Sequence, residues 1–194
     1  MIGGIPQDLK FDGEPSTAEI GDYTTIRECV TINKGTKDRM KTKVGSHCLL
    51  MAYVHLAHDC QVGNHTIFAN NSQLAGHVHV DDHAILGGFT VVHQFCRLGA
   101  HSFTAMHSLL FADLPPFVMA QGQPAQARSM NFEGLRRRGF SAERISAVKA
   151  MHKSLYRQQL TLAQAQSEIE LLTHKYPEAK ADVDMMLGFL QGAS

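Results

Sequence analysis

The chain has 194 residues, of which 44% are apolar, so it is long enough to bury a substantial core. Its 18 Lys and Arg residues balance 18 Asp and Glu residues, which gives no reason to expect nucleic acid or an anionic membrane as a general partner. The apolar runs are far shorter than the roughly 20 residues of a transmembrane helix, and we find no signal peptide, so we expect neither export nor a membrane anchor.

The first 43 residues contain the start of a repeat and one interruption. Ile20, Ile26 and Ile32 are spaced by six residues, and the polar stretch 34–43 then breaks the spacing. We expect that stretch to form a loop that projects from a corner of the fold. Residues 1–6 begin close to a coil, without a helix or charged strand to protect an open strand edge. This predicts that the natural chain is longer or that a partner covers this end.

Residues 44–98 contain a hexapeptide repeat. Every sixth residue is a large aliphatic residue or Phe, and the residue four places later is small or β-branched. This period fits neither a helix nor a lone alternating strand, but it fits a chain that turns a corner after each short strand and closes a triangular coil every three repeats. The repeat therefore predicts a parallel β-helix domain over residues 1–120. The large positions are Val44, Leu50, Leu56, Val62, Phe68, Leu74, Val80, Leu86, Val92 and Leu98.

The cysteines follow the same pattern. Cys48, Cys60 and Cys96 occupy the small inward position of the repeat, Cys29 lies at a neighbouring position, and the sequence has no C-x-x-C pair. This pattern is typical of reduced core thiols and favours the cytoplasm.

The tail changes to a helical pattern and predicts a second domain over residues 121–194. Pro115-Pro116 cannot continue the strand ladder. From about Asn131 we expect helices, with Ser141 as one N-cap, Thr161 and Gln164 as a capping box, and a third helix after Pro177. The residues expected on buried helix faces are Ile145, Val148, Met151, His152 and Leu155 in the first helix and Ile169, Leu171 and Leu172 in the second.

One column of polar residues has the composition of a reaction site. His58, His77 and His93 lie in successive coils within one residue of the same phase, with Gly76 and Gln94 stacked on His58. A neutral imidazole can take a proton from a hydroxyl near pH 7, and a glycine N–H can bind a developing oxyanion. The neighbouring Asp59 can orient the ring of His58, and His55 lies three residues before it. Because corner histidines are often only solvated, it is their clustering that favours a site.

A second column consists of His47, His65, His83 and His101. We expect these rings to face outward and to play a structural role, because no acid, nucleophile or glycine amide is stacked beside them. Protonation below about pH 6 would place like charges roughly 4.8 Å apart and weaken the coils.

Two further patterns leave alternatives open. Imidazoles from neighbouring subunits of a trimer can complete a zinc site. The column of His58, His77 and His93 runs along the axis and does not converge on one point, so we expect no metal.

The run Arg136-Arg137-Arg138 is either a solvated helix face or a clamp for a phosphate-bearing partner.

Several spaced motifs together give the chain a resemblance to one enzyme family, and they cover nearly its whole length. The sequence resembles the acyl-[acyl-carrier-protein]–UDP-N-acetylglucosamine O-acyltransferases, which catalyse the first step of lipid A biosynthesis. The motifs are Gln7-Asp8-Leu9-Lys10 with Gly13-Glu14-Pro15, Ile26-Arg27-Glu28 with Val30-Thr31-Ile32, His55-x-x-His58-Asp59, Leu74-Ala75-Gly76-His77-Val78, Val92-His93-Gln94-Phe95-Cys96, and Asn131-Phe132-Glu133-Gly134-Leu135-Arg136-Arg137-Arg138-Gly139-Phe140.

The resemblance implies a left-handed β-helix that forms a homotrimer with active sites between subunits. It implies that His58 is the general base for the glucosamine 3-hydroxyl, that Asp59 supports it, and that the Gly76 amide binds the oxyanion. The acyl donor is a (3R)-3-hydroxyacyl chain on acyl carrier protein, and no other cofactor is expected. Residues matching substrate-binding positions are Asp8, Lys10, His55, His77, His93, Gln94, Asn131, Glu133, Arg137 and Arg138.

The chain departs from the family in two respects. Family members begin with roughly 65 further residues of coils, which leaves Asp8 and Lys10 near an end of this chain. Met106 stands where the family measures the acyl chain, and its bulk predicts a short donor of about ten carbons. Two other functions remain as alternatives, namely a structural or catalytically impaired trimer that lacks the first coils and a trimeric zinc hydro-lyase.

Overall fold

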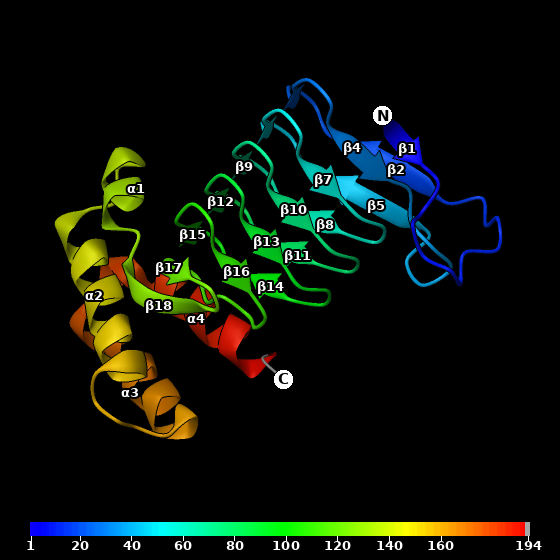
Figure 1. The fold of residues 1–194 in the computed structure, drawn as a ribbon. Helices are drawn as coiled ribbons and strands as arrows, with labels where there is room; N and C mark the ends of the chain where they lie inside the picture. Colours follow the sequence, from blue (N-terminus) through cyan, green and yellow to red (C-terminus); the bar gives the residue numbers. More distant parts are fainter. Residues whose placement is uncertain (193–194) are drawn as a thin grey trace.

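The structure is a computed structural model that describes residues 1–192. The chain forms a left-handed parallel β-helix whose C-terminal end is covered by helices (Figure 1). Short strands stack into three sheets, and the chain visits each sheet once per coil. Within the described residues, no helix is both long enough and apolar enough to cross a bilayer.

The strands of the three sheets are as follows. Sheet A contains β1 (Ile2–Gly4), β4 (Thr31–Asn33), β7 (His55–Leu56), β10 (Gln73–Leu74), β13 (Val91–Val92) and β16 (Leu109–Leu110). Sheet B contains β2 (Thr17–Ile20), β5 (Lys41–Val44), β8 (Gln61–Val62), β11 (His79–Val80) and β14 (Arg97–Leu98). Sheet C contains β3 (Thr25–Ile26), β6 (Leu49–Leu50), β9 (Ile67–Phe68), β12 (Ile85–Leu86), β15 (Phe103–Thr104), β17 (Val118–Gly122) and β18 (Ala125–Met130).

The hexapeptide repeat builds the core as the sequence predicts. All ten large positions from Val44 to Leu98 are at most 3% exposed, and the small inward cysteines Cys48, Cys60 and Cys96 are buried beside them. Regular register keeps the columns continuous, because Gln73 pairs with His55 on one side and with Val91 on the other. Each fully buried aliphatic side chain contributes about 1.5–3 kcal/mol, so the core is a sum of equivalent layers.

Three corners join the sheets. The A–B corner carries residues 58–59, 76–77 and 94–95, the B–C corner carries 46–47, 64–65, 82–83 and 100–101, and the C–A corner carries 52–53, 70–71, 88–89 and 106–107. The second residue of each corner adopts a left-handed backbone conformation although it is not glycine, as at Asp59 (φ 60°) and His77 (φ 64°). The repeated ladder imposes this conformation, which is unfavourable for most side chains.

The polar insertion is shorter than expected. Only its first part, through Met40, is a loop, whereas Lys41–Val44 is strand β5 and pairs with both β2 and β8. Alternation explains the difference, because Thr42 and Val44 point inward while Lys41 and Lys43 are exposed.

The domain boundary predicted at residue 120 lies within sheet C. It cuts strand β17, which pairs with β15 and continues through the β17–β18 hairpin, so sheet C extends to Met130. The helices begin only afterwards. They are α1 (Phe132–Arg137), α2 (Ala142–Tyr156), α3 (Leu162–Lys175), the 3-10 turn Pro177–Ala179 and α4 (Lys180–Gln191).

The predicted helix signals are mostly present. Ser141 caps α2 by accepting a hydrogen bond from the Arg144 N–H, and Thr161 and Gln164 form a capping box at α3. Val148, Met151 and Ile169 are buried, but Leu171 is 59% exposed, so its placement on the buried face was wrong. Arg97 fastens the last helix to sheet B, because its guanidinium donates to the Phe189 carbonyl over 3.0 Å.

The B–C corner carries a continuous stack of aromatic rings. The centroids of Tyr23, His47, His65, His83 and His101 follow one another at 4.8–5.0 Å, and Phe117 continues the stack. The prediction that all four histidines face outward is wrong for His101, which is only 9% exposed because Phe117 and Phe140 cover it. Burial, with smaller effects of Arg138 and His83, lowers the pKa of His101 to about 3.

This stack predicts a pH-dependent stability. The native state keeps His101 neutral down to about pH 3, whereas the unfolded chain takes up a proton below about pH 6.5. The stabilising contribution is therefore complete above pH 6.5 and decreases as the pH falls toward 3. Thermal unfolding should show a melting temperature that falls less steeply with acid in His101→Phe than in the wild type. Equal slopes for the two proteins would contradict this assignment.

Candidate functional site

A cavity of about 720 Å³ lies at the A–B corner, next to the N-terminal segment. Five of the predicted site residues, Asp8, Lys10, His58, His77 and Gln94, line it together. Residues from four separate sequence motifs therefore meet at one cavity. The other lining residues are Gln7, Leu9, Glu14, Thr36, Lys37, Asp38 and Phe95.

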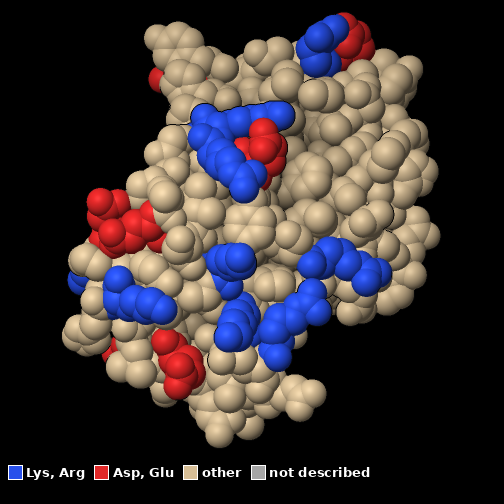
Figure 2. Space-filling model, turned by 90° about the vertical axis from the view of Figure 1, so that its left-hand side faces the viewer, with Lys and Arg blue, Asp and Glu red and all other residues tan. Residues whose placement is uncertain are grey.

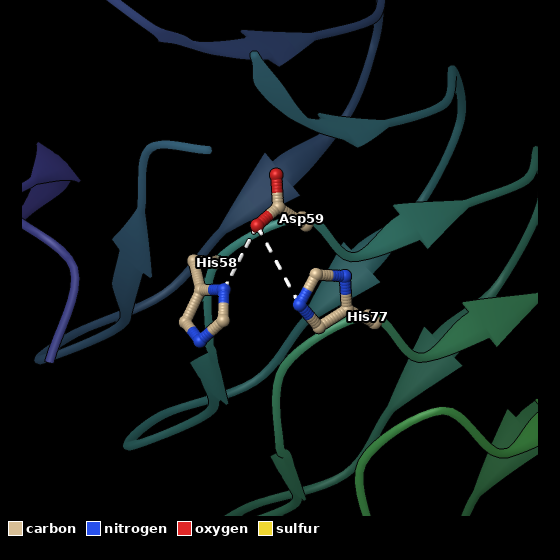
Figure 3. A group of neighbouring side chains, drawn as sticks. All are labelled: His58, Asp59 and His77. Atoms are coloured by element: carbon tan, nitrogen blue, oxygen red, sulfur yellow. Dashed lines mark hydrogen bonds and ion pairs between the residues drawn. The ribbon is translucent and has the colours of Figure 1, made fainter. Parts of the chain in front are cut away.

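His58 and Asp59 form a dyad at the wall of this cavity (Figure 3). The Nδ1 atom of His58 lies 2.9 Å from Asp59 Oδ2, while the His58 side chain is 15% exposed and the Asp59 side chain is fully buried. Successive residues of a strand would point to opposite faces, but the left-handed backbone of Asp59 at the corner turns its carboxylate toward the preceding ring. The predicted pairing of the two residues is present.

Thr36 holds the carboxylate of Asp59 in place. Its N–H donates to Asp59 Oδ1 over 3.0 Å and its hydroxyl donates to Oδ2 over 2.6 Å. Burial pushes the pKa of Asp59 upward, but the hydrogen bonds from Thr36 and His58 outweigh burial, so its pKa is lower than usual. Asp59 therefore stays ionised and can stabilise a positively charged imidazole. Sequence analysis missed Thr36, because a threonine within a polar insertion has no distinctive spacing.

Gly76 lies directly against the ring of His58. A Cβ atom at this position would come within 2.6 Å of His58 Cε1 and 2.7 Å of Nε2, so only glycine leaves room for the ring. Within residues 1–192, the Gly76 N–H has no hydrogen-bond acceptor, whereas its carbonyl accepts from the Phe95 N–H. The Nε2 edge of His58 and the available glycine amide thus share one corner, as predicted.

His77 forms the floor beside the dyad. Its side chain is 10% exposed, its ring stacks on Phe95 with centroids 4.6 Å apart, and its edge meets the ring of His58 at 5.1 Å. Its Nε2 lies 3.8 Å from carboxylate oxygens of both Asp59 and Asp38. Burial lowers the pKa of His77, although the two carboxylates oppose this shift. Among residues 1–192, His58, Asp59 and His77 form the one group of three or more His, Cys, Asp or Glu side chains whose ligand atoms all lie within 4.8 Å of one another.

Two predicted residues lie outside the cavity lining, on the outer side of sheet A. His55 Nδ1 is 2.7 Å from the Thr31 hydroxyl, and burial lowers the pKa of His55. His93 is exposed and tilted against Phe111, with ring centroids 5.8 Å apart. Of the three histidines, only His58 and His77 line the cavity. His93 lies one residue before the corner residues 94–95 of its coil, so its side chain points elsewhere.

The residues predicted after the solenoid lie at other corners. Asn131 caps α1 and donates from Nδ2 to the His101 carbonyl, and Arg138 donates to the His83 carbonyl, both at the B–C corner. Glu133 pairs with Arg137 over 3.2 Å on the exposed side of α1. Met106 is 65% exposed at the C–A corner. Within one chain, none of these five residues lines the cavity beside His58.

Cys60 is not a nucleophile despite its place beside Asp59. Its side chain is fully buried, and burial raises the pKa of its thiol to about 12. The thiolate is the reactive form of cysteine, so the histidine remains the group that can start a reaction.

The helical end carries a basic groove that sequence analysis did not identify. Figure 2 shows Lys and Arg side chains gathered on the face formed by the C-terminal helices. Lys149, Lys153, Arg157 and Lys175 line a cavity of about 550 Å³ between α2 and α3, with Tyr176 at its edge. These cations lie on or next to two different helices, so they do not form a continuous basic run in the sequence. The groove suits a negatively charged partner.

Comparisons with known proteins agree with this arrangement. A family profile described as "Udp N-acetylglucosamine O-acyltransferase; Domain 2" matches residues 113–194, and a hexapeptide transferase profile matches residues 41–76. The chain is 66% identical over its whole length to the acyl-[acyl-carrier-protein]–UDP-N-acetylglucosamine O-acyltransferase of Albidiferax ferrireducens, of which it covers 74%. It is 56% identical to the protein of that name from Thiobacillus denitrificans, with 99% of this chain and 73% of the relative covered.

A solved structure extends the likeness to three dimensions. The UDP-N-acetylglucosamine O-acyltransferase of Moraxella catarrhalis superimposes with a TM-score of 0.93 at 40% identity, over 100% of this chain and 74% of the other. The chain thus spans about three quarters of the length of these relatives. The 66% identity over the whole chain, together with the shared fold, shows that the chain belongs to the acyl-[acyl-carrier-protein]–UDP-N-acetylglucosamine O-acyltransferase family.

Proposed function

We propose that this chain transfers a (3R)-3-hydroxyacyl group from acyl carrier protein to the 3-hydroxyl of UDP-N-acetylglucosamine, the first step of lipid A biosynthesis. The observation that carries the proposal is the placement of His58, which is bonded to buried Asp59 through Nδ1 and lies against Gly76 along its Nε2 edge. The names of relatives 66% and 56% identical to this chain support the choice of substrates.

The chemistry follows from this placement. His58 Nε2 accepts the proton of the sugar hydroxyl as the oxygen attacks the thioester carbonyl carbon, and the carbonyl oxygen becomes an oxyanion that accepts a hydrogen bond from the Gly76 N–H. Collapse of the tetrahedral intermediate breaks the C–S bond, and the imidazolium returns its proton to the leaving thiolate. The ionised Asp59 stabilises the imidazolium between these steps.

The active unit is proposed to be a homotrimer in which a neighbouring subunit completes the cavity. Asn131, Arg138 and Met106 lie at corners other than that of His58, so they can serve this reaction only across a subunit boundary. Large apolar side chains exposed around sheet A support such a contact. They are Tyr53 (58%), Phe89 (51%), Val91 (41%), Phe95 (61%) and Phe111 (59%).

The donor and the compartment complete the proposal. The reaction uses the phosphopantetheine-linked donor and no further cofactor or catalytic metal, and it takes place in the cytoplasm. Four free cysteines support a reducing compartment. The basic groove between α2 and α3 offers a surface for the anionic carrier.

A non-enzymatic trimer is the less favoured alternative. It would require the segment with Asp8 and Lys10 to be displaced, but both residues line the cavity with His58. A zinc hydro-lyase finds no support in the family comparison.

The first prediction concerns the base. His58→Ala should lower acyl transfer by about 10²-fold or more while leaving the circular dichroism spectrum unchanged, because proton abstraction is lost but the core is not. A transfer assay with carrier-linked 3-hydroxyacyl donors measures the effect, and His65→Ala at the exposed B–C corner is the matched control with normal turnover. Retained activity in His58→Ala would exclude this residue as the base.

A second prediction concerns the room that Gly76 leaves. The methyl group of Gly76→Ala would lie 2.6 Å from the His58 ring and displace it, so turnover should fall by about 10²-fold. Gly188→Ala in α4, where the added carbon meets no atom within 4 Å, should retain turnover. The same assay measures both variants, and normal turnover in Gly76→Ala would contradict the described packing of the two residues.

The acyl-chain prediction concerns Met106. Met106→Gly should shift the preferred donor from about ten carbons to longer chains, because the bulky side chain no longer stands where the family measures the acyl chain. Competition among donors of increasing length measures the preference, and Met106→Leu should keep the short one. An unchanged profile in Met106→Gly would refute the assignment.

A further inference from the structure

We propose that His58, Asp59 and His77 form a binding site for Zn²⁺, and that zinc bound there stops acyl transfer. The inhibitory half of this inference rests on the proposed function, whereas the binding half rests on geometry alone. The three groups surround one point at the A–B corner (Figure 3).

The distances suit a tetrahedral ion. Donors that lie 2.0–2.1 Å from zinc at tetrahedral angles are about 3.3 Å apart. Asp59 Oδ2 lies 2.9 Å from His58 Nδ1 and 3.8 Å from His77 Nε2, so these separations bracket the ideal value. All three ligand atoms lie within 4.8 Å of one another, so small side-chain rotations would bring them all within bonding distance of one zinc ion.

Asp38 supplies a fourth donor. Its Oδ2 atom lies 3.8 Å from His77 Nε2, and its side chain is 64% exposed on the loop above the site, so it is free to turn toward an ion. Two imidazoles and two carboxylates form a donor set typical of zinc. Thr36 already orients the Asp59 carboxylate by two hydrogen bonds, which is the support that metal-binding carboxylates require.

Binding would disable the base through its tautomer. Because an ionised Asp59 can only accept, the contact assigns the single proton of neutral His58 to Nδ1 and leaves the free electron pair on Nε2. Zinc on Nδ1 moves that proton to Nε2, so Nε2 can no longer accept one from a hydroxyl. No proton is lost from the ring, and no oxidant or reductant takes part.

The histidine stack at the B–C corner is a poor competitor for zinc. The rings of His47 and His65 are parallel within 2° and 4.9 Å apart, and those of His65 and His83 are parallel within 8° and 4.8 Å apart. Within residues 1–192, no three His, Cys, Asp or Glu ligand atoms of this stack lie within 4.8 Å of one another.

The test is a calorimetric titration of the purified full chain with ZnCl₂ in a non-chelating buffer, with the transfer assay run in parallel. We expect one zinc per chain, loss of transfer at saturation, recovery with EDTA and no response to Mg²⁺, which prefers oxygen ligands. Asp38→Asn and His77→Gln should each weaken zinc binding by about tenfold or more. His65→Gln and Asp22→Asn, at the B–C corner, should bind zinc as the wild type does.

The outcomes separate the two proposals. Absence of saturable zinc binding, binding unaffected by both Asp38→Asn and His77→Gln, or binding lost in His65→Gln would each overturn the site. Zinc that binds at one per chain without lowering transfer would overturn the inhibition. A chain inactive in EDTA would count against the proposed function instead, and the calorimetric curve would still decide the zinc site.

Discussion

Parallel pairing of residues 18 positions apart is the constraint on which the rest of the molecule depends. It converts a one-dimensional spacing into columns, so a buried leucine lies on a buried leucine and a corner residue lies on a corner residue. It also forces non-glycine residues at the corners into the left-handed conformation, at a cost of roughly 1–2 kcal/mol each. Burial of the continuous apolar columns offsets this cost. The strands therefore supply the stability, and the corner positions can carry polar, reactive side chains.

The same constraint brings the reacting groups together. His58 and Gly76 belong to adjacent coils of one column, and the absence of a side chain at Gly76 lets the Cε1–Nε2 edge of the imidazole approach the next coil. Asp59 needs a contribution from outside the regular columns, because a buried carboxylate without partners would be unstable or neutral. Thr36, at the start of the insertion, supplies it, and losing one such partner of a buried charged group costs about 1–3 kcal/mol. The interruption of the repeat is thus what keeps the base oriented.

Periodicity explains which features could be predicted from the sequence. Val44 to Leu98 and the pairing of His58 with Gly76 follow from a spacing, and the structure has them as expected. Cys48, Cys60 and Cys96 are buried as their spacing predicts, whereas Cys29, outside the inward position, is exposed. Features without a spacing could not be found. Thr36 and Asp38 lie in a loop whose path no period determines, and the burial of His101 depends on Phe140 from the helical end. Sheet C continues past residue 120 for a related reason, because a hairpin can extend a parallel sheet after the repeat has ended.

The contacts that make His58 a stronger base also make it a potential metal ligand. A histidine is a better base when a carboxylate accepts its Nδ1 proton, and that carboxylate must be buried and ionised to be effective. In a solenoid the next coil places another residue of the same corner about one strand spacing away, and here that residue is His77. An ionised oxygen between two imidazoles is a metal-binding arrangement, whatever the enzyme's own chemistry requires. The stacking that brings His58 and Asp59 into the dyad therefore also brings His77 to the proposed zinc site. A substitution that weakens zinc binding but leaves the dyad intact must lie outside this column, as Asp38 does.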